Sequence, residues 1–317
     1  MSVEIFLVEI EGNKIPQNAK VDRFETFDGI HLRYAVFKTE LAKTKGTICV
    51  FTGRSEPIEK YFETIKNLQI RGYDVAIMDW RGQGLSDRLT SNRRKGHVTT
   101  FENYAKDVDV FMGKIVKQQC KKPYIALSHS TGACVLTQVL AEPKTADLFE
   151  KVILISPFYK FEISTLKNIV VRFISAFLVT FGMGKLKATF LEGMPKELKP
   201  FDSNNLISSD KFRMEREQKI IKANLNLAIG APTFGWLHAA FLSIKKINNP
   251  KFVRNIRTPV LILMGLGDYL VSQKSIRKVA SNVKNCKLIE IDDGRHELLM
   301  ERDELQKPVW AAIDAFI

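Results

Sequence analysis

Short apolar runs alternate with longer amphipathic segments along most of this chain, and the alternation predicts its main elements. Strands are expected at residues 47–51, 74–79, 123–127, 151–156, 259–264 and 286–291, and helices at residues 58–71, 101–119 and 131–140. Residues 21–37 alternate between apolar and polar side chains around Asp28-Gly29, which predicts a hairpin. Strands separated by helices indicate an α/β fold with a mainly parallel, doubly wound sheet, to which the hairpin adds antiparallel edge strands.

The alternation fails between residues 158 and 247, where the sequence is aromatic-rich and mostly helical in pattern. Gly182-Met183-Gly184 and residues 195–202 interrupt this stretch. An insertion at this point projects over the carboxyl ends of the parallel strands. We therefore predict a core in two parts, residues 1–157 and 249–317, with a helical cap at residues 158–248.

The pentad Ser128-His129-Ser130-Thr131-Gly132 directly follows the strand at residues 123–127 and runs into an apolar helix. Strand, sharp turn and helix form the context of a nucleophile elbow, in which a strained turn holds the central serine clear of the sheet. The residues two places on either side must be small. Gly132 meets this need, and Ser128, which stands where the usual pattern has glycine, is still small.

A serine hydroxyl is a weak nucleophile unless a base and an orienting acid accompany it. Asp268 follows the strand at residues 259–264, and His296 follows the strand at residues 286–291. Both lie just past a strand end, in the order Ser, Asp, His that accompanies this elbow. We predict that Ser130 is the nucleophile, that His296 is the base and that Asp268 fixes its tautomer.

The other candidates for base and acid fit less well. Each remaining histidine lies in a strand pattern, a charged loop, the elbow itself or a helix: His31, His97, His129 and His238. Asp292 and Asp293 are nearer to His296 in sequence than Asp268, but with Gly294 they have the pattern of a turn.

Acyl transfer also needs N–H donors that face the developing oxyanion. The backbone N–H of Thr131, first in the elbow helix, is one candidate. Gly53 follows the strand at residues 47–51 and lets the backbone approach a substrate closely, which makes the N–H of Arg54 the second candidate. The alternative is an ordinary strand-to-helix turn at Gly53.

The chain resembles α/β-hydrolases of the lysophospholipase and monoacylglycerol lipase branch, with serine aminopeptidase S33-like features, and is most similar to the bacterial inner-membrane lysophospholipases. Besides the elbow, the matching segments are Thr52-Gly53-Arg54-Ser55-Glu56 with Lys60-Tyr61, Asp79-Trp80-Arg81-Gly82-Gln83-Gly84-Leu85-Ser86, Gly267-Asp268 with Val271, and Gly294 with His296-Glu297. Thr52 stands where monoacylglycerol lipases carry histidine, which suits the Gly-Arg-x-Glu form of the lysophospholipases. The resemblance implies a cap that defines the acyl-binding pocket.

Residues 169–181 of the predicted cap form an apolar run broken only by Arg172, too short to span a bilayer. Three interpretations stay open: a helix packed on the core, a wall of an acyl tunnel, or a surface that dips into a membrane. Phe173 and Phe177 in this run, together with His238, are the candidate pocket residues.

The formal net charge is +13, and residues 159–248 contribute 14 Lys and Arg against 7 Asp and Glu. A basic surface attracts anionic partners. Beside an apolar run it suits an anionic bilayer, where each well-placed cation adds about 1 kcal/mol. A solvated basic surface is the alternative. Nucleic acid is not an expected partner, because no groove-reading helix or aromatic-basic sheet motif is visible.

The cysteines and the N-terminus bear on location. Cys49, Cys120, Cys134 and Cys286 lie mostly within strand or helix patterns, which is typical of buried, reduced thiols. Glu4 and Glu9 stand among the first apolar residues without a basic leader, so no signal peptide is expected. These observations predict a cytoplasmic protein with peripheral contact to the inner face of the cytoplasmic membrane as an option.

Together these patterns predict a serine hydrolase of lipid carboxylic esters that needs no metal or cofactor and acts on a lysophospholipid. The alternatives are a monoacylglycerol lipase or general carboxylesterase, and less favourably a peptidase of the proline-iminopeptidase type, which needs an acidic site for a substrate amine. A non-catalytic binder would be expected to lack one of Ser130, Asp268 and His296.

Overall fold

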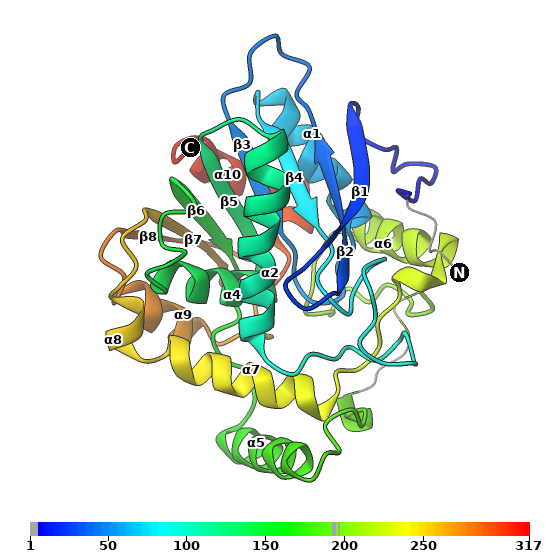
Figure 1. Cartoon of the computed structure of the whole chain (residues 1–317), viewed down its shortest axis with the longest axis vertical. Coiled ribbons are helices and arrows are strands. Elements are labelled where there is room, and N and C mark those ends of the chain that lie inside the picture. Colours follow the sequence, from blue (N-terminus) through cyan, green and yellow to red (C-terminus); the bar gives the residue numbers. More distant parts are fainter. Residues whose placement is uncertain (1–5, 192–194, 196) are drawn as a thin grey trace.

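The computed structural model describes residues 6–191, 195 and 197–317, and an eight-stranded sheet forms its centre (Figure 1). The strands are β1 (Ala19–Glu25), β2 (His31–Phe37), β3 (Thr47–Phe51), β4 (Asp74–Met78), β5 (Tyr124–His129), β6 (Lys151–Ile155), β7 (Val260–Gly265) and β8 (Cys286–Ile291). Their order is β1-β2-β4-β3-β5-β6-β7-β8. β2 is antiparallel to both β1 and β4, and the remaining neighbours are parallel. The predicted mainly parallel sheet with an edge hairpin is confirmed.

Helices cover both faces of the sheet, as a parallel sheet requires. Those of the core are α1 (Phe62–Ile70), α2 (Phe101–Phe111), α3 (Lys117–Gln119), α4 (Ser130–Ala141), α8 (Pro250–Val253), α9 (Gln273–Ala280) and α10 (Asp303–Asp314). One apolar cluster joins α2, α4 and α9 to the sheet, and a second joins α1 and α10 to its other face. The predicted helix at 58–71 begins with a 3-10 turn (Ile58–Tyr61), and that at 101–119 passes through a π turn (Met112–Val116).

The predicted helical insertion lies between β6 and β7. It contains α5 (Thr165–Thr180), α6 (Lys211–Ala223), α7 (Phe234–Ile247) and the 3-10 turns Thr189–Leu191 and Leu225–Leu227. The two predicted interruptions fall between these helices, and residues 192–194 and 196 of this region, like Glu4 at the N-terminus, lie outside the described residues. In Figure 1, α7 runs across the lower end of the sheet, and α5 packs against the far side of α7.

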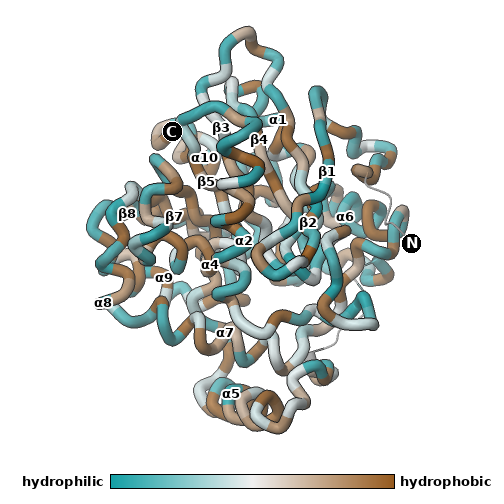
Figure 2. Tube along the Cα trace, in the orientation of Figure 1, coloured by the Kyte–Doolittle hydropathy of each residue, from teal (hydrophilic) through white to brown (hydrophobic). Residues whose placement is uncertain are grey.

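α5 is an apolar helix that the core does not cover (Figure 2). Ser175 is its only buried residue. Its exposed apolar side chains, here named the α5 patch, recur every three or four residues and so share one side of the helix: Leu166, Ile169, Val170, Phe173, Ile174, Phe177 and Phe181. The expectation of a helix packed on the core therefore fails for this side of α5, although its other side packs on α7 and Val171 lies against the core cluster. No helix in the described part of the chain is long and apolar enough to cross a bilayer.

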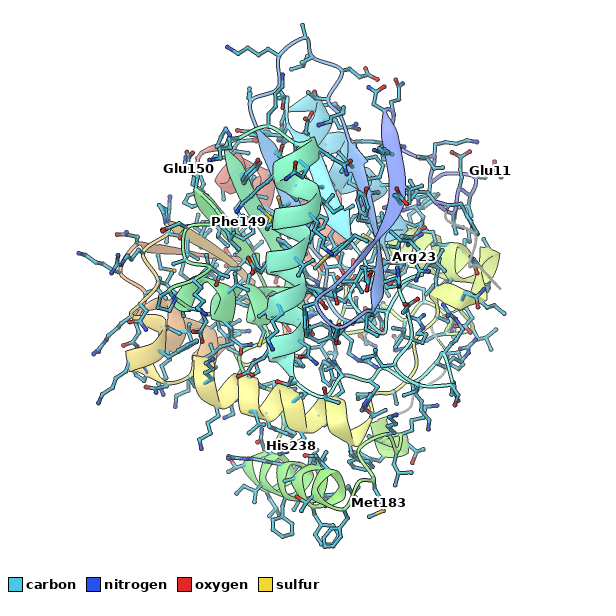
Figure 3. The ribbon with its side chains drawn as sticks, viewed as in Figure 1. Glu11, Arg23, Phe149, Glu150, Met183 and His238 are labelled. Atoms are coloured by element: carbon cyan, nitrogen blue, oxygen red, sulfur yellow. The ribbon has the colours of Figure 1, made fainter. Side chains whose placement is uncertain are left out.

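α7 separates α5 from the rest of the molecule. His238 of α7 is partly buried and lies on the side of α7 that faces α5 (Figure 3). The neighbouring residues Trp236 and Leu237 are buried and turn toward the core instead. Because successive helical residues are rotated by about 100°, one helix presents different residues to α5 and to the sheet.

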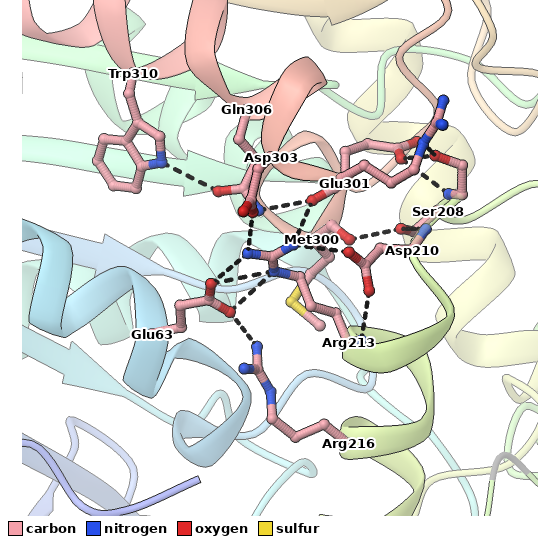
Figure 4. Close-up of polar contacts among 12 residues, drawn as sticks. Glu63, Ser208, Asp210, Arg213, Arg216, Met300, Glu301, Asp303, Gln306 and Trp310 are labelled. Carbon is pink, nitrogen blue, oxygen red and sulfur yellow. Dashed lines mark hydrogen bonds and ion pairs between the residues drawn. The ribbon is translucent and has the colours of Figure 1, made fainter. Parts of the chain in front are cut away.

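In contrast to α5, α6 is fixed to the core by charged contacts (Figure 4). Arg213 donates hydrogen bonds to Glu63 of α1 at 3.0 Å, to Asp303 of α10 at 2.7 Å and to the carbonyl oxygen of Glu301 at 3.0 Å. Arg216 also pairs with Glu63. The insertion therefore has one helix held between α1 and α10 and another that extends outward.

Candidate active site

Ser130 lies at the sharp turn between β5 and α4. Its φ of 48° is the left-handed conformation that a nucleophile elbow imposes. A side chain at Gly132 would bring its Cβ within 2.5 Å of the carbonyl oxygen of Thr52, so glycine is required there. At Ser128, the hydroxyl donates a hydrogen bond to the carbonyl oxygen of Phe51 at 3.0 Å. This satisfied hydroxyl explains why serine fits where related elbows have glycine.

The structure brings the three residues predicted to form the triad into one hydrogen-bonded chain. The Nε2 atom of His296 lies 2.9 Å from the Oγ atom of Ser130, and its Nδ1 atom lies 2.8 Å from Oδ2 of Asp268. The other carboxylate oxygen of Asp268 accepts hydrogen bonds from the N–H groups of Leu270 at 2.9 Å and Val271 at 3.3 Å. With Nδ1 protonated toward Asp268, Nε2 is free to accept the proton of Ser130.

Close backbone packing holds the acid and histidine loops together. A side chain at Gly265, at the end of β7, would overlap the carbonyl oxygen of Gly294. Asp293 has a φ of 55°, which agrees with the predicted turn there. In the described part of the chain its carboxylate forms no hydrogen bond or ion pair with His296, whereas that of Asp268 does, so geometry favours Asp268 as the histidine's partner.

Three of the other histidines lie elsewhere or serve other contacts. His31 is exposed and lies 3.6 Å from Asp87. His97 is buried, and its Nδ1 atom is 2.7 Å from the hydroxyl of Thr233, which caps α7. His238 is on α7, as described above. None of these three is hydrogen-bonded to Ser130 in the described structure.

The two residues predicted to supply oxyanion N–H groups, Arg54 and Thr131, line the same cavity as Ser130. The N–H of Thr131 is in the first turn of α4, where N–H groups have no acceptor within the helix. Arg54 follows Gly53, where an added Cβ would lie 2.6 Å from Oε2 of Glu56. The N–H of Ser55 donates to Oε1 of Gln83 at 2.7 Å, which holds the loop from its other end.

Glu56 and His129 form a buried pair beside the site, which the sequence analysis did not assign a role. Glu56 accepts hydrogen bonds from the N–H of Gly53 and from Lys60 at 2.9 Å. One of its oxygens lies 3.0 Å from Nδ1 of His129. The Nε2 atom of His129 lies 3.1 Å from the carbonyl oxygen of His296, and the two imidazole centres are 4.9 Å apart. The pair thus connects the Arg54 loop to the His296 loop.

Both members of this pair favour their charged forms. Burial alone would raise the pKa of Glu56, but the charges of His129 and Lys60 outweigh it and hold that pKa well below its usual range. Burial alone would lower the pKa of His129, and the carboxylate of Glu56 reverses this and raises it. Two features of the sequence could have indicated the role of Glu56. It lies four residues before Lys60, and both residues belong to the Gly53-to-Tyr61 segment that resembles the lysophospholipases.

A cavity of about 290 Å³ opens above Ser130. Its lining combines polar residues, among them Arg54, Ser55, Glu56 and His129, with apolar side chains. The apolar side chains come from the insertion, including α7, and from the acid loop: Phe158, Phe161, Ile207, Pro232, Trp236, Leu237, Leu270 and Val271. The cavity can therefore contact both a polar group and an apolar chain.

The three residues predicted to line the pocket do not line this cavity. Phe173 and Phe177 are 71% and 50% exposed on α5, and His238 faces α5 rather than Ser130. The physical reason is that α7 stands between α5 and the serine, and that Trp236 and Leu237 of α7, rather than His238, turn toward the cavity. The interpretation of residues 169–181 as an acyl-tunnel wall is wrong for the same reason.

A mainly parallel eight-stranded sheet, a serine at a strand-turn-helix elbow and a cavity above it define an α/β-hydrolase. The chain belongs to the serine aminopeptidase, S33 family, whose pattern matches residues 42–303. It is 29% identical over 274 residues to the probable lysophospholipase L2 of Haemophilus influenzae, covering 84% of this chain and 81% of that protein. It is 27% identical over 309 residues to lysophospholipase L2 of Escherichia coli K12, covering 92% and 86% respectively.

Solved structures share the same fold. A soluble variant of monoglyceride lipase from Saccharomyces cerevisiae superposes with a TM-score of 0.73 at 18% identity, covering 95% of this chain and 94% of that chain. A thermostable carboxyl esterase from Bacillus coagulans gives 0.75 at 18% identity, covering 95% and 99%. The predicted branch of the α/β-hydrolases and the predicted class, a carboxylic ester hydrolase, agree with the family and the relatives.

Proposed function

We propose that this protein deacylates lysophospholipids through a covalent acyl-enzyme. The observation that carries the proposal is the continuous hydrogen-bonded chain from Ser130 through His296 to Asp268. It lies beneath a cavity whose lining is largely apolar with a few polar groups, which suits an acyl chain and a polar head group. The two lysophospholipase L2 relatives support the same substrate class.

In the proposed reaction, Oγ of Ser130 attacks the ester carbonyl carbon while Nε2 of His296 takes its proton. The N–H groups of Arg54 and Thr131 stabilise the negative charge on the carbonyl oxygen. The bond from carbonyl carbon to glycerol oxygen then breaks, and His296 protonates the leaving alcohol. Water, activated by His296, adds to the acyl-enzyme, releases the fatty acid and restores Ser130.

The cavity favours esters over peptides. An aminopeptidase needs a carboxylate that is available to a substrate amine. The two carboxylates that line this cavity, Glu56 and Glu297, are both ion-paired with Lys60, at 2.9 and 2.6 Å. A monoacylglycerol or simple carboxylic ester would fit the same serine, and these are the alternatives that a substrate comparison must separate.

A panel of four substrate classes tests the proposal: a lysophospholipid, a monoacylglycerol with the same acyl chain, a short p-nitrophenyl ester and an aminoacyl anilide. We expect the highest kcat/KM on the lysophospholipid and no turnover of the anilide, because the ion-paired carboxylates cannot hold its amine. Preferred cleavage of the anilide would overturn the proposal. A preference for monoacylglycerol would retain the ester hydrolase and reassign its substrate.

We further propose that the α5 patch makes peripheral contact with an anionic membrane. Apolar helix faces normally turn toward the core, whereas seven large apolar side chains of this patch face away from it. The same insertion carries 14 basic against 7 acidic residues. Apolar area together with basic charge is what holds an interfacial helix on anionic lipid.

Replacing both Phe173 and Phe177 with serine is expected to weaken binding to phosphatidylglycerol-containing vesicles on the order of 10- to 100-fold, since two buried phenyl rings are lost. Vesicle sedimentation measures it. Raised salt should also weaken wild-type binding by screening. Phe212→Ser, a change of an 86% exposed phenylalanine on α6, is the matched control and should bind as wild type does. Equal vesicle binding by the wild type and both variants would disprove the proposal that the α5 patch contacts the membrane.

A further inference from the structure

The side chain of Arg54 is a charged group in the cavity that the proposed mechanism does not use. Of the described residues that line the cavity, it alone is a lysine or arginine. A guanidinium has five N–H donors. One Nη group of Arg54 donates to the carbonyl oxygen of Gly230, and the other lies 3.3 Å from the hydroxyl of Ser55. The buried Nε–H has no protein acceptor among the described residues.

Arg54 also differs in its charge environment from Arg33 and Arg81, which are each 1% exposed. Arg33 pairs with Glu59 and Asp79, each at 2.7 Å. Arg81 pairs with Asp28 and Asp107, at 2.7 and 2.6 Å. No described carboxylate lies within ion-pair distance of Arg54, whose guanidinium carbon lies 5.4 Å from the ring of Trp236. Burying an unneutralised charge is costly, so an anion at this place would be stabilised.

The side chain is held in place by the backbone around it. An added Cβ at Gly96 would lie 2.6 Å from one of its terminal nitrogens, so the guanidinium lies directly against the backbone of Gly96. The N–H of Gly230 donates to the carbonyl oxygen of Arg94, and the N–H of Thr233 donates to that of Gly96. These bonds fix both walls of a slot that holds the guanidinium. Desolvation in the slot lowers the pKa of Arg54 to about 10, which still leaves it charged at neutral pH.

We propose that the guanidinium of Arg54 binds the phosphate of the substrate head group, a role that rests on the proposed function. In a lysophospholipid, glycerol links the ester carbonyl to the phosphate. The backbone N–H of Arg54 would then contact the carbonyl oxygen, and its side chain would contact the phosphate. A guanidinium is suited to phosphate because its parallel N–H groups match two phosphate oxygens. A monoacylglycerol has no such group, so Arg54 would set the preference for phosphate-bearing lipids.

The test is the ratio of kcat/KM for palmitoyl lysophosphatidylethanolamine to kcat/KM for monopalmitoylglycerol, both in the same neutral detergent micelles. Arg54→Gln keeps the backbone N–H, so any shift of the loop affects both substrates alike. We expect it to lower the ratio about 10- to 100-fold, the effect of losing a charge-assisted contact. Arg54→Lys, which restores the charge without the parallel N–H groups, should recover part of this loss.

Arg88 provides a matched control. It is half-buried, its Nε and Nη1 atoms are buried without a described partner, its pKa is lowered to about 10 by desolvation, and its Nη2 donates to the carbonyl oxygen of Asn226 at 2.7 Å. It does not line the cavity, so Arg88→Gln should leave the substrate ratio at its wild-type value. A similar fall in the ratio for Arg88→Gln would mean that the effect comes from general destabilisation, and would overturn the assignment.

Other outcomes separate this inference from the proposed function. An unchanged ratio in Arg54→Gln overturns the head-group role and leaves the ester hydrolase intact. A wild-type enzyme that hydrolyses neither lipid overturns the proposed function itself. Inorganic phosphate tests whether the anion is free phosphate instead. In that case phosphate would inhibit hydrolysis of a short soluble ester by the wild type but not by Arg54→Gln, and the lipid ratio would be unchanged. This result would mean that the site binds free phosphate and not the head group.

Discussion

Replacing Ser130 with alanine is expected to lower the turnover of every ester substrate by a factor on the order of 10⁴ to 10⁶. The reason is that, in the proposed mechanism, Oγ of Ser130 forms the covalent bond to the acyl group, and this atom lies 2.9 Å from Nε2 of His296. Steady-state kinetics on a lysophospholipid and on a short p-nitrophenyl ester would measure the loss. Circular dichroism and the melting temperature should stay close to wild type, because the substitution removes one small atom at the cavity surface.

Ser128→Gly is the control for this variant. It changes a serine in the same pentad and restores the residue usual in such elbows, at the cost of one buried hydrogen bond to Phe51. It should keep its turnover and its labelling by a fluorophosphonate, whereas Ser130→Ala should lose both. More than about a tenth of the wild-type rate in Ser130→Ala would far exceed the loss of a triad member and would disprove the nucleophile assignment.

Asp268→Asn should lower kcat by a factor on the order of 10⁴ with little change in KM. The amide can donate to Nδ1 of His296, which favours the tautomer that carries its proton on Nε2 and cannot take one from Ser130. The measurement is a pair of kcat and KM values on a soluble ester. Asp293→Asn, in the turn before the histidine, should be far milder. A larger loss in Asp293→Asn than in Asp268→Asn would reverse the assignment of the acid.

The inner strands of the sheet could be predicted from the sequence as apolar runs because they are buried on both faces, as β3, β4, β5 and β7 are. Residues 47–51 and 286–291 were predicted with the boundaries that β3 and β8 have. The elbow could be predicted because its signal lies in consecutive residues: an apolar strand, the small residues around Ser130 and an apolar helix follow one another directly. Ser130, Asp268 and His296 each follow the carboxyl end of a parallel strand. Because these ends lie at one edge of the sheet, the sequence already indicates that the three residues meet.

The orientation of α5 could not be predicted in the same way. Its apolar positions show only that one side of the helix is hydrophobic, and the burial of that side depends on what packs there. In the structure α7 occupies the place next to the cavity, so Phe173 and Phe177 face outward. The prediction that Phe173 and Phe177 line the pocket is therefore wrong, because their hydrophobic character alone does not show which surface they face.

The Glu56–His129 pair could not be predicted for a different reason. His129 lies inside the elbow next to the nucleophile, and Glu56 lies in a separate motif that follows β3. Only the fold shows that they meet, and that together they join the loop carrying Arg54 to the loop carrying His296. A contact between residues 73 positions apart leaves no periodicity in the sequence.

The contacts of Lys60 limit how this enzyme can be recombined with its relatives. Its buried ammonium pairs with Glu56 at 2.9 Å, with Glu297 at 2.6 Å and with Glu217 of α6 at 3.5 Å. Exchanging the whole insertion without an acidic residue at the position of Glu217 would disturb a buried charge cluster, and breaking such a cluster costs about 3 to 5 kcal/mol. Chimeras with related enzymes should therefore keep α6 together with the core. Exchanging α5 alone would leave the buried charge cluster of Lys60 intact.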